Sequence, residues 1–226
     1  MTSLFIDVVS SNLMVALIID QELVHSSKIE TNESKYASDL IIPKIEKLLL
    51  DYNLDYTQLD YVFSIVGPGN YTNIRTGIAV AKGISISRNI PSYGLTQHEL
   101  IAKTYNKNKF SDNHIMVLVP SNNDDFYCQK FSMSGSIQKN PDILNFNEVL
   151  DQIQHNNPIV LETSNELLKH TIKKNIILER LESNYTIDEK NLTEIHSVIN
   201  THKPLVEPIY LRDLNIKKYK KKKIYE

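Results

Sequence analysis

The chain has 226 residues, of which 41% are hydrophobic and 23% charged, and its formal net charge is −2. These values are typical of a globular protein with one large domain or two small lobes, and they exclude a disordered chain. There is no apolar run long enough to span a bilayer, no signal-peptide pattern, and a single cysteine, Cys128, which cannot form an internal disulfide. We therefore expect a cytoplasmic protein.

The N-terminal segment predicts a meander of three strands followed by a helix. Short alternating apolar runs at residues 4–9, 13–19 and 23–29 predict the strands, and the polar turns between them suit tight connections. Residues 36–50 have helical apolar spacing. Because Ile42 widens the apolar stripe, we expect this helix to be sandwiched inside the domain or shared with a partner.

The next stretch, VGPGNYTNIRTGIAVAKG from Val66 to Gly83, holds four of the six glycines. Asn70 or Thr72 is suited to cap a helix that starts after the glycines. The elements predicted around this stretch are a strand at residues 61–66, a turn at 67–70, a helix to about residue 87, a strand at 91–95 and a helix at 97–105.

Residues 106–113 are polar and without periodicity, and they mark the best boundary between two lobes. Beyond them the pattern predicts strands at 114–119, 126–133 and 158–162, helices at 147–154, 164–174 and 188–200, and an extended segment at 207–211. Both halves begin with hairpin strands and continue with alternating helices and strands. We expect two α/β lobes, 1–105 and a smaller 106–206, followed by an extended basic tail, 207–226.

The glycine-rich turn does not match either common phosphate-binding motif. A P-loop needs a lysine and a hydroxyl residue after its last glycine, and GPGNYTNIR has no lysine there. Pro68 also removes a backbone donor. In the dinucleotide pattern Gly-x-Gly-x-x-Gly, Thr72 stands in the place of the third glycine. An anion bound at the N-terminus of the following helix stays an alternative.

Small residues recur four positions apart in the helix after the turn, at Gly77 with Ala81 and at Ala79 with Gly83. A glycine inside a helix costs about 1 kcal/mol relative to alanine, so two of them call for a packing reason. One reading is close packing on the lobe's own sheet, and the other is a helix brought by a partner. On the second reading, Gly77→Leu would block the partner and leave the fold intact.

The sequence gives no sign of a catalytic centre. None of the seven histidines stands four residues from another, so a metal site and a metal cofactor are not expected. No Gly-x-Ser-x-Gly elbow occurs, and Cys128 lies within an apparent strand, FYCQKF, where a cysteine is usually a packed residue.

The C-terminal stretch IKKYKKKKIYE is strongly basic. Its lysines are Lys217, Lys218, Lys220, Lys221, Lys222 and Lys223. Such tails often contact the phosphates of nucleic acids, and the alternative is a solvated tail. In the sequence no aromatic platform or arginine accompanies these lysines to favour nucleic acid.

Four stretches together resemble TsaB, the YeaZ-type family of bacterial tRNA threonylcarbamoyladenosine synthesis: IDVVSSNLMVALI, IIPKIEKLL, GPGNYTNIRTGIAVAKGISI and IPSYGLTQHELIA. The usual loop of that family reads Gly-Pro-Gly-Ser-Phe-Thr-Gly-Leu-Arg. The matching residues are Gly67, Pro68, Gly69, Thr72 and Arg75. The segment EPIYLR, residues 207–212, is similar to the family's ending. The resemblance is strong over about residues 1–105 and weak from 106 to 206.

The resemblance implies an actin-like (ASKHA, ribonuclease-H-like) fold and a non-catalytic subunit. Such a subunit pairs with TsaD, and with TsaE, to modify the adenosine 3′ of the anticodon, so that tRNA is contacted through the complex. It also implies that the first two helices pack on TsaD as a bundle, or on a second copy of the chain. The contact residues we expect are Ser38, Ile41, Ile42, Ile45, Ile74, Gly77, Ile78 and Ala81.

Some features depart from enzymes of this fold and from the family itself. Actin-like ATPases hold phosphates with Asp-x-Gly turns, whereas Asp7 is followed by two valines, so we expect no bound nucleotide. The family often has a histidine where Ala37 stands, and an Ile-Asp-Ala-Arg stretch where residues 119–122 read VPSN. Two alternatives remain: an actin-fold ATPase or peptidase-like enzyme, and a tRNA-binding module that uses the lysine tail.

Overall fold

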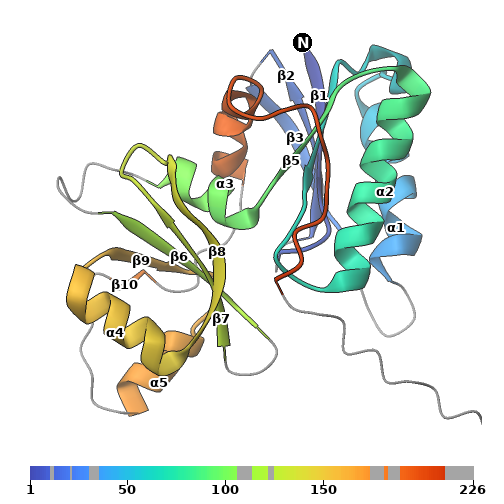
Figure 1. The fold of residues 1–226 in the computed structure, drawn as a ribbon. Coiled ribbons are helices and arrows are strands. Elements are labelled where there is room, and N and C mark those ends of the chain that lie inside the picture. The colour runs from blue at the N-terminus through green and yellow to red at the C-terminus, as the bar shows by residue number, and fades with distance from the viewer. Residues whose placement is uncertain are drawn as a thin grey trace, which may run out of the picture.

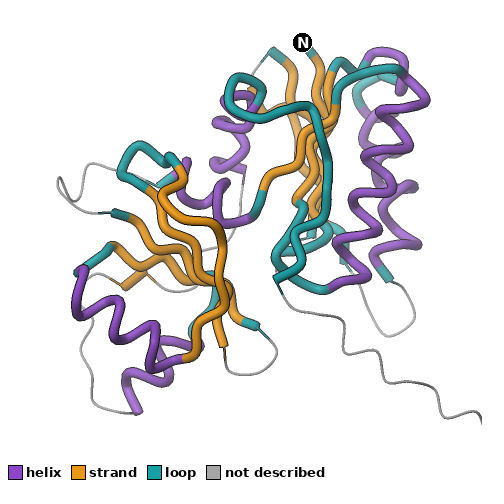
Figure 2. Tube along the Cα trace, in the orientation of Figure 1, coloured by secondary structure: helices purple, strands orange, loops and turns teal. Residues whose placement is uncertain are grey.

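The computed structural model describes residues 1–10, 13–20, 22–30, 36–105, 114–121, 125–173, 181–182 and 189–211. Within these ranges the chain forms two lobes, each built on a five-stranded mixed sheet with helices (Figure 1, Figure 2). The predicted α/β architecture is therefore confirmed. No helix in the described ranges is long and apolar enough to cross a membrane. The predicted linker at 106–113 and the six lysines of the tail lie outside them.

The first sheet has the strand order β3-β2-β1-β4-β5. Its strands are β1 (Thr2–Asp7), β2 (Met14–Ile19), β3 (Glu22–Lys28), β4 (Tyr61–Ile65) and β5 (Ser92–Leu95). β1 pairs antiparallel with β2 and parallel with β4, so the predicted meander forms one half of the sheet. Successive residues of a strand face opposite sides, and Leu4 and Ile6 enter one apolar cluster while Phe5 enters another.

Helices α1 (Ala37–Asp51) and α2 (Tyr71–Arg88) cover one face of this sheet, side by side (Figure 1). Their apolar residues pack on Leu4 and Ile6, with Ile41 contributed by α1 and Ala81 by α2. A short 3-10 helix, η1 (Tyr56–Gln58), leads from α1 into β4. The helical spacing of residues 36–50 therefore reflects burial against the sheet.

The opposite face of the first sheet packs on α3 (Gln97–Thr104) and on a 3-10 helix, η3 (Glu189–Val198). One apolar cluster runs from Phe5 in the first sheet through Leu100 of α3 to Val117 and Phe131 in the second sheet. The two lobes therefore share part of their core.

The second sheet has the order β10-β9-β6-β7-β8. Its strands are β6 (Ile115–Pro120), β7 (Asp125–Phe131), β8 (Ile137–Asn145), β9 (Ile159–Glu162) and β10 (Leu181–Glu182), and its helices are α4 (Phe146–Asn156) and α5 (Glu166–Lys173). As in the first sheet, an antiparallel meander is extended by parallel strands that follow helices. The two halves repeat one plan.

After the second sheet the chain returns to the first lobe. Gly94 N–H donates to the Leu205 carbonyl at 3.1 Å, and Val206 is buried against Val66. The predicted range of the second lobe, 106–206, therefore needs correction, because residues 189–206 pack on the first lobe. A local apolar pattern predicts a helix but does not tell which sheet that helix will cover.

Candidate functional site

The glycine-rich turn joins β4 to α2 and is largely buried. Gly67 has a φ of +128°, which favours glycine, and the Gly67–Pro68 bond is cis. Asn70 is the N-cap of α2, and its Oδ1 accepts hydrogen bonds from the backbone of Thr72 at 3.0 Å and of Asn73 at 3.2 Å. Of the two caps that the sequence allows, Asn70 and Thr72, the structure has Asn70.

The two glycines of the turn are required by close neighbours from the same chain. A Cβ on Gly67 would lie 2.8 Å from the backbone oxygen of Ile209, and a Cβ on Gly69 would lie 2.5 Å from Val9 Cγ1. The Ile209 N–H donates to the Val66 carbonyl at 2.9 Å. The C-terminal segment therefore packs directly on this turn.

Two other residues of the loop motif, Arg75 and Thr72, lie at the surface beside this turn. Arg75 is exposed, and its guanidinium donates to the Tyr71 hydroxyl at 2.9 Å while lying 5.2 Å from the centre of the same ring. The Tyr71 ring lies 4.8 Å from the ring of Tyr210 in the C-terminal segment. Thr72 is exposed.

Asp7, at the end of β1, is closed off by its own turn. Its carboxylate accepts hydrogen bonds from Val9 N–H and Ser10 N–H, both at 2.9 Å, and from the Ser10 hydroxyl at 2.5 Å. Burial raises the pKa of Asp7, and the hydrogen bonds from Ser10 and Val9 oppose that rise. The carboxylate therefore stabilises its own turn, and little of its hydrogen-bonding capacity is left for a ligand.

A cleft of about 280 Å³ lies between the lobes, beside Ser10 and the start of α2. Among the residues that the structure describes, its lining includes Asn70, Ser121 and Ser164 but no charged residue. A triphosphate would find no lysine or arginine on these walls to balance its charge. Among the described residues, no group of three or more histidine, cysteine, aspartate or glutamate residues could hold a metal ion.

Gly77 faces the first sheet. A Cβ there would lie 3.0 Å from Val8 Cγ2 and 3.3 Å from Ser64 Oγ. Of the two readings of the small-residue pattern, packing on the lobe's own sheet therefore holds for Gly77. The expectation that Gly77→Leu would leave the fold intact is wrong, because a leucine would collide with the protein's own strands.

Most of the predicted contact residues are likewise inside the lobe. The buried ones are Ile41, Ile45, Ile74, Gly77, Ile78 and Ala81, which pack in the first lobe's own core. Only Ser38 and Ile42 of the predicted set are exposed. The list is corrected accordingly, because these side chains pack inside the first lobe and present little surface to a partner.

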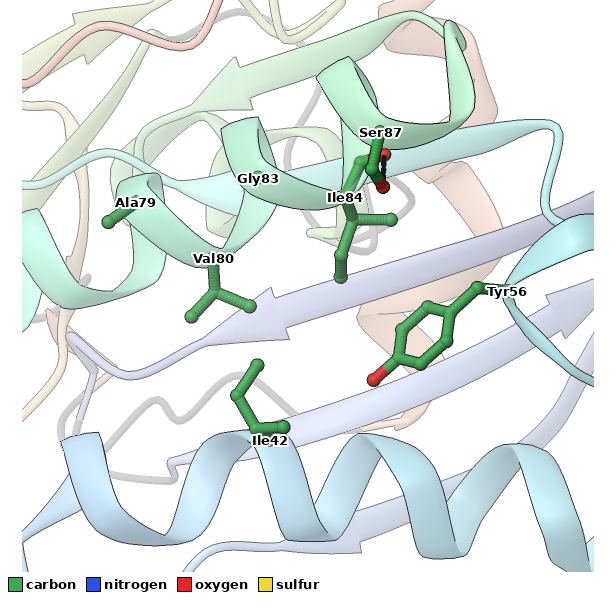
Figure 3. Close-up of a pocket in the computed structure, with 7 residues that line it drawn as sticks. All are labelled: Ile42, Tyr56, Ala79, Val80, Gly83, Ile84 and Ser87. Carbon is green, nitrogen blue, oxygen red and sulfur yellow. Dashed lines mark hydrogen bonds between the residues drawn. The ribbon is translucent and has the colours of Figure 1, made fainter.

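A groove between α1 and α2 remains at the surface (Figure 3). It measures about 450 Å³ and is lined by Ile42, Tyr56, Ala79, Val80, Gly83, Ile84 and Ser87. Figure 3 shows Ile42 of α1 and Val80 of α2 pointing toward one another, with Tyr56 at one side. A Cβ on Gly83 would meet no atom within 4 Å. The second reading of the pattern, room for another helix, therefore fits Gly83.

The sequence contains the row of small residues that borders this groove, but the spacing does not say which row faces a partner. Ala79, Gly83 and Ser87 are spaced four apart, so they form one row of small residues along α2, with Gly83 about a third of a turn away from Gly77. Tyr56 could not have been found, because only the fold brings η1 beside α2.

The comparisons with known proteins identify the family. The model of the family "TsaD: tRNA N6-adenosine threonylcarbamoyltransferase" matches residues 27–178. Two proteins named "tRNA threonylcarbamoyladenosine biosynthesis protein TsaB" are similar: one from Buchnera aphidicola subsp. Acyrthosiphon pisum (strain APS) is 26% identical over 195 residues, which are 84% of this chain and 76% of the relative. The other, from Buchnera aphidicola subsp. Schizaphis graminum (strain Sg), is 24% identical over 62% of this chain and 73% of its own. The chain belongs to the TsaB (YeaZ) family. It is thus a homologue of proteins of tRNA threonylcarbamoyladenosine biosynthesis.

Solved structures agree on the fold. YeaZ from Pseudomonas aeruginosa superposes with a TM-score of 0.69 at 15% identity, covering 93% of this chain and 99% of that one. A candidate N-acetylmannosamine kinase of Listeria monocytogenes superposes with a TM-score of 0.56 at 11% identity, covering 89% and 99%. The predicted actin-like (ASKHA, ribonuclease-H-like) fold is confirmed.

Gly77 and Gly83 should respond in opposite ways to a larger side chain. We expect Gly77→Leu to lower the free energy of unfolding by about 1–3 kcal/mol or more, because it overpacks the helix against β1 and β4. Gly83→Leu should be neutral or stabilising by up to about 1 kcal/mol, because it removes a helix glycine where space is open. Urea unfolding of both variants measures this, and an equal loss in the two would contradict the assignment of the faces.

A hydrogen bond between Glu99 and His202 attaches the C-terminal segment to α3, and its contribution should depend on pH. The Glu99 carboxylate lies 2.9 Å from His202 Nε2 and also accepts from Thr96 N–H at 2.7 Å. Burial would raise the pKa of Glu99, but the hydrogen bonds from His202 and Thr96 outweigh it, and the pKa lies below its ordinary value. The stabilisation is therefore complete above about pH 4.5 and is lost as the pH falls through the lower folded-state pKa.

We expect Glu99→Gln to lower the free energy of unfolding by about 1–3 kcal/mol at pH 7. The difference from the wild type should shrink as the pH is lowered below 4.5, because Glu99 then becomes protonated in the wild type too. Urea unfolding of both proteins between pH 3 and 7 checks this. A difference that stays constant over this range would show that the charge of Glu99 is irrelevant.

Proposed function

We propose that this chain is a non-catalytic subunit that pairs with TsaD, together with TsaE, in the threonylcarbamoyl modification of tRNA in the cytoplasm. The observation that carries the proposal is the open groove between α1 and α2, which centres on Gly83. Membership of the TsaB family suggests the process, which is threonylcarbamoyladenosine biosynthesis on tRNA. The groove suggests where a partner would bind.

The groove has the features of a helix-docking site. Its walls are mainly apolar, with Ile42 on α1 facing Val80 and Ile84 on α2. Ala79 and Gly83 carry small or no side chains, so the backbone of an incoming helix could approach α2 closely. An amphipathic helix that buries its apolar face in such a groove is a recurring mode of recognition. A helix of TsaD is the proposed occupant, and a second copy of this chain is the alternative.

The state of the groups that an enzyme would need supports a non-catalytic role. The carboxylate of Asp7 is engaged by Val9 and Ser10, and the cleft between the lobes has no charged wall among the described residues. Burial raises the pKa of the Cys128 thiol to about 12, so this cysteine is not a thiolate nucleophile near neutral pH. The ATPase and peptidase alternatives therefore lack supporting groups here, and calorimetry with ATP and magnesium tests the first directly.

Gly83→Leu should block pairing with TsaD. The leucine would project into the open groove without disturbing the fold, so we expect at least a tenfold weaker affinity for TsaD, or about 1.4 kcal/mol. Co-purification and calorimetry with the cognate TsaD measure the binding, and reconstitution with TsaD, TsaE and tRNA measures the modification. Ile42→Glu, on the opposite wall, should have the same effect.

Lys82→Leu is the matched control. It adds a leucine to α2 at the position next to Gly83, but Lys82 is exposed and does not line the groove. This variant should bind TsaD like the wild type. If Gly83→Leu and Lys82→Leu both bind normally, the groove is not the docking site, and if the chain has no effect on tRNA modification, the proposed function fails.

A further inference from the structure

Another cavity lies between the lobes, beside the C-terminal segment. It measures about 330 Å³, and its walls come from β5, the start of α3 and the C-terminal segment on one side and from β7 and β8 on the other. Binding sites for small molecules have volumes of about 300–1,000 Å³, so this cavity suits a small ligand. The lining residues that matter most are Glu99, Gln129, Ile137, His202, Leu205 and Glu207. We call this space the Glu99 cavity.

The inner end of the Glu99 cavity carries a buried negative charge. Glu99 is 6% exposed, and its carboxylate accepts a hydrogen bond from Thr96 N–H and lies 2.9 Å from His202 Nε2. Burial opposes the charge, but the hydrogen bonds from His202 and Thr96 outweigh it and lower the pKa of Glu99, so the group is ionised at neutral pH. A carboxylate has about four acceptor sites, and the described residues occupy two of them.

The described walls of the cavity have more negative than positive groups. Glu207, at the exposed mouth, adds a second carboxylate. His202 adds at most one positive charge, and no lysine or arginine is among the described residues that line the cavity. With two carboxylates, the lining carries −2 when His202 is neutral and −1 when it is protonated. Such a lining favours a cation and disfavours an anion.

A buried amide from the second lobe has hydrogen-bonding capacity to spare. Gln129 of β7 is 2% exposed and lines the cavity. Its side-chain oxygen accepts one long hydrogen bond, at 3.4 Å, from the Thr96 hydroxyl, and its side-chain N–H groups have no partner among the described residues. Since buried donors without an acceptor are unfavourable, Gln129 favours a ligand that presents a neutral oxygen.

Apolar side chains lie at the mouth of the cavity. Ile137 of β8 is 49% exposed and Leu205 of the C-terminal segment is 50% exposed, and both line the cavity. Exposed aliphatic side chains leave apolar surface in water, so a ligand with an apolar group would gain by covering them. The charge lies at the inner end and the apolar surface at the mouth.

We propose that the Glu99 cavity binds a small organic amine that carries a neutral oxygen acceptor and an apolar group. The ammonium group would donate to the free acceptor sites of Glu99, with Glu207 adding to the negative field. The oxygen would accept from Gln129, and the apolar group would pack on Ile137 and Leu205. A metal ion would have no use for the amide donors, and no group of three possible metal ligands occurs among the described residues. The cavity shares no lining residue with the groove between α1 and α2.

Four probes with one carbon skeleton test the three requirements. Leucinamide has the ammonium, the carboxamide oxygen and an isobutyl group. 4-Methylpentanamide lacks the ammonium, 3-methylbutylamine lacks the carboxamide, and leucine has a carboxylate in place of the amide. Binding to the isotope-labelled full chain is followed by NMR titration at about pH 6.5, where these amines are protonated.

We expect leucinamide to bind the wild type about tenfold more tightly than 4-methylpentanamide or leucine, because a hydrogen bond to a charged group is lost or an anion is introduced. It should bind about threefold more tightly than 3-methylbutylamine, because a neutral hydrogen bond contributes less. The backbone amide signals of Gly94 and Gln129, in the cavity, should shift, and that of Gly83, in the groove, should not.

Three variants assign the contacts. Glu99→Gln should remove the preference for leucinamide over 4-methylpentanamide, and Glu207→Gln should weaken leucinamide about threefold through the lost charge. Gln129→Leu should lower the affinity for leucinamide to that for 3-methylbutylamine and leave the latter unchanged. Glu22→Gln is the matched control, because Glu22 is an exposed carboxylate on β3 that does not line the cavity. It should bind all four probes like the wild type.

Equal affinity of the wild type for leucinamide and 4-methylpentanamide would overturn the inference, as would signal shifts confined to residues outside the cavity. If Glu99→Gln fails to fold, Glu207→Gln decides, because Glu207 is exposed, and unchanged leucinamide binding by that variant would also overturn it. Because none of these measurements involves TsaD, the result is independent of the proposed function.

The same chemistry occurs in a free amino-acid amide and in the N-terminal residue of a peptide. Leucyl-glycyl-glycinamide separates these two sources, because it extends leucinamide only beyond the carboxamide. Binding as tight as that of leucinamide would assign the cavity to a peptide N-terminus, and weaker binding would assign it to a free amine.

Discussion

The packing of the C-terminal segment on the β4–α2 turn is the constraint on which the first lobe depends. The carbonyl of Ile209 leaves no space for a side chain on Gly67, and Ile209 in turn bonds to Val66. This contact fixes where α2 begins, because Asn70 caps the helix three residues after Gly67. The orientation of α2, and with it both of its faces, follows from a contact between residues more than 140 positions apart in the chain.

The two faces of α2 have different surroundings, and we propose that one serves folding and the other serves binding of a partner. Gly77 allows the helix to lie close to β1 and β4, while Gly83 leaves a hollow on the side of α1. A helix that is small-residue-rich on both sides cannot be assigned to one role from its sequence, since the spacing is the same in both rows. Contacts with Val8 and Ser64 on one side, and open space on the other, separate the roles.

Much of the fold was predictable because the relevant signals are local. The alternation of residues 4–9 and the cap at Asn70 predict elements that the structure contains. The contact residues were predicted less well, because Ile41 and Ala81 are apolar whether they face a sheet or a partner. The return of residues 189–206 to the first lobe, and the meeting of Tyr71 with Tyr210, depend on contacts distant in sequence, which periodicity does not encode.

The core shared between the lobes has a mechanical consequence. Phe5, Leu100 and Phe131 belong to one apolar cluster, and the chain passes between the lobes twice, through α3 and again before η3. Many enzymes with two lobes rotate them about a hinge to enclose a ligand. Here such a rotation would have to separate the side chains of this shared cluster, which are buried between the lobes. The shared core therefore favours a fixed arrangement of the two lobes over a hinged one.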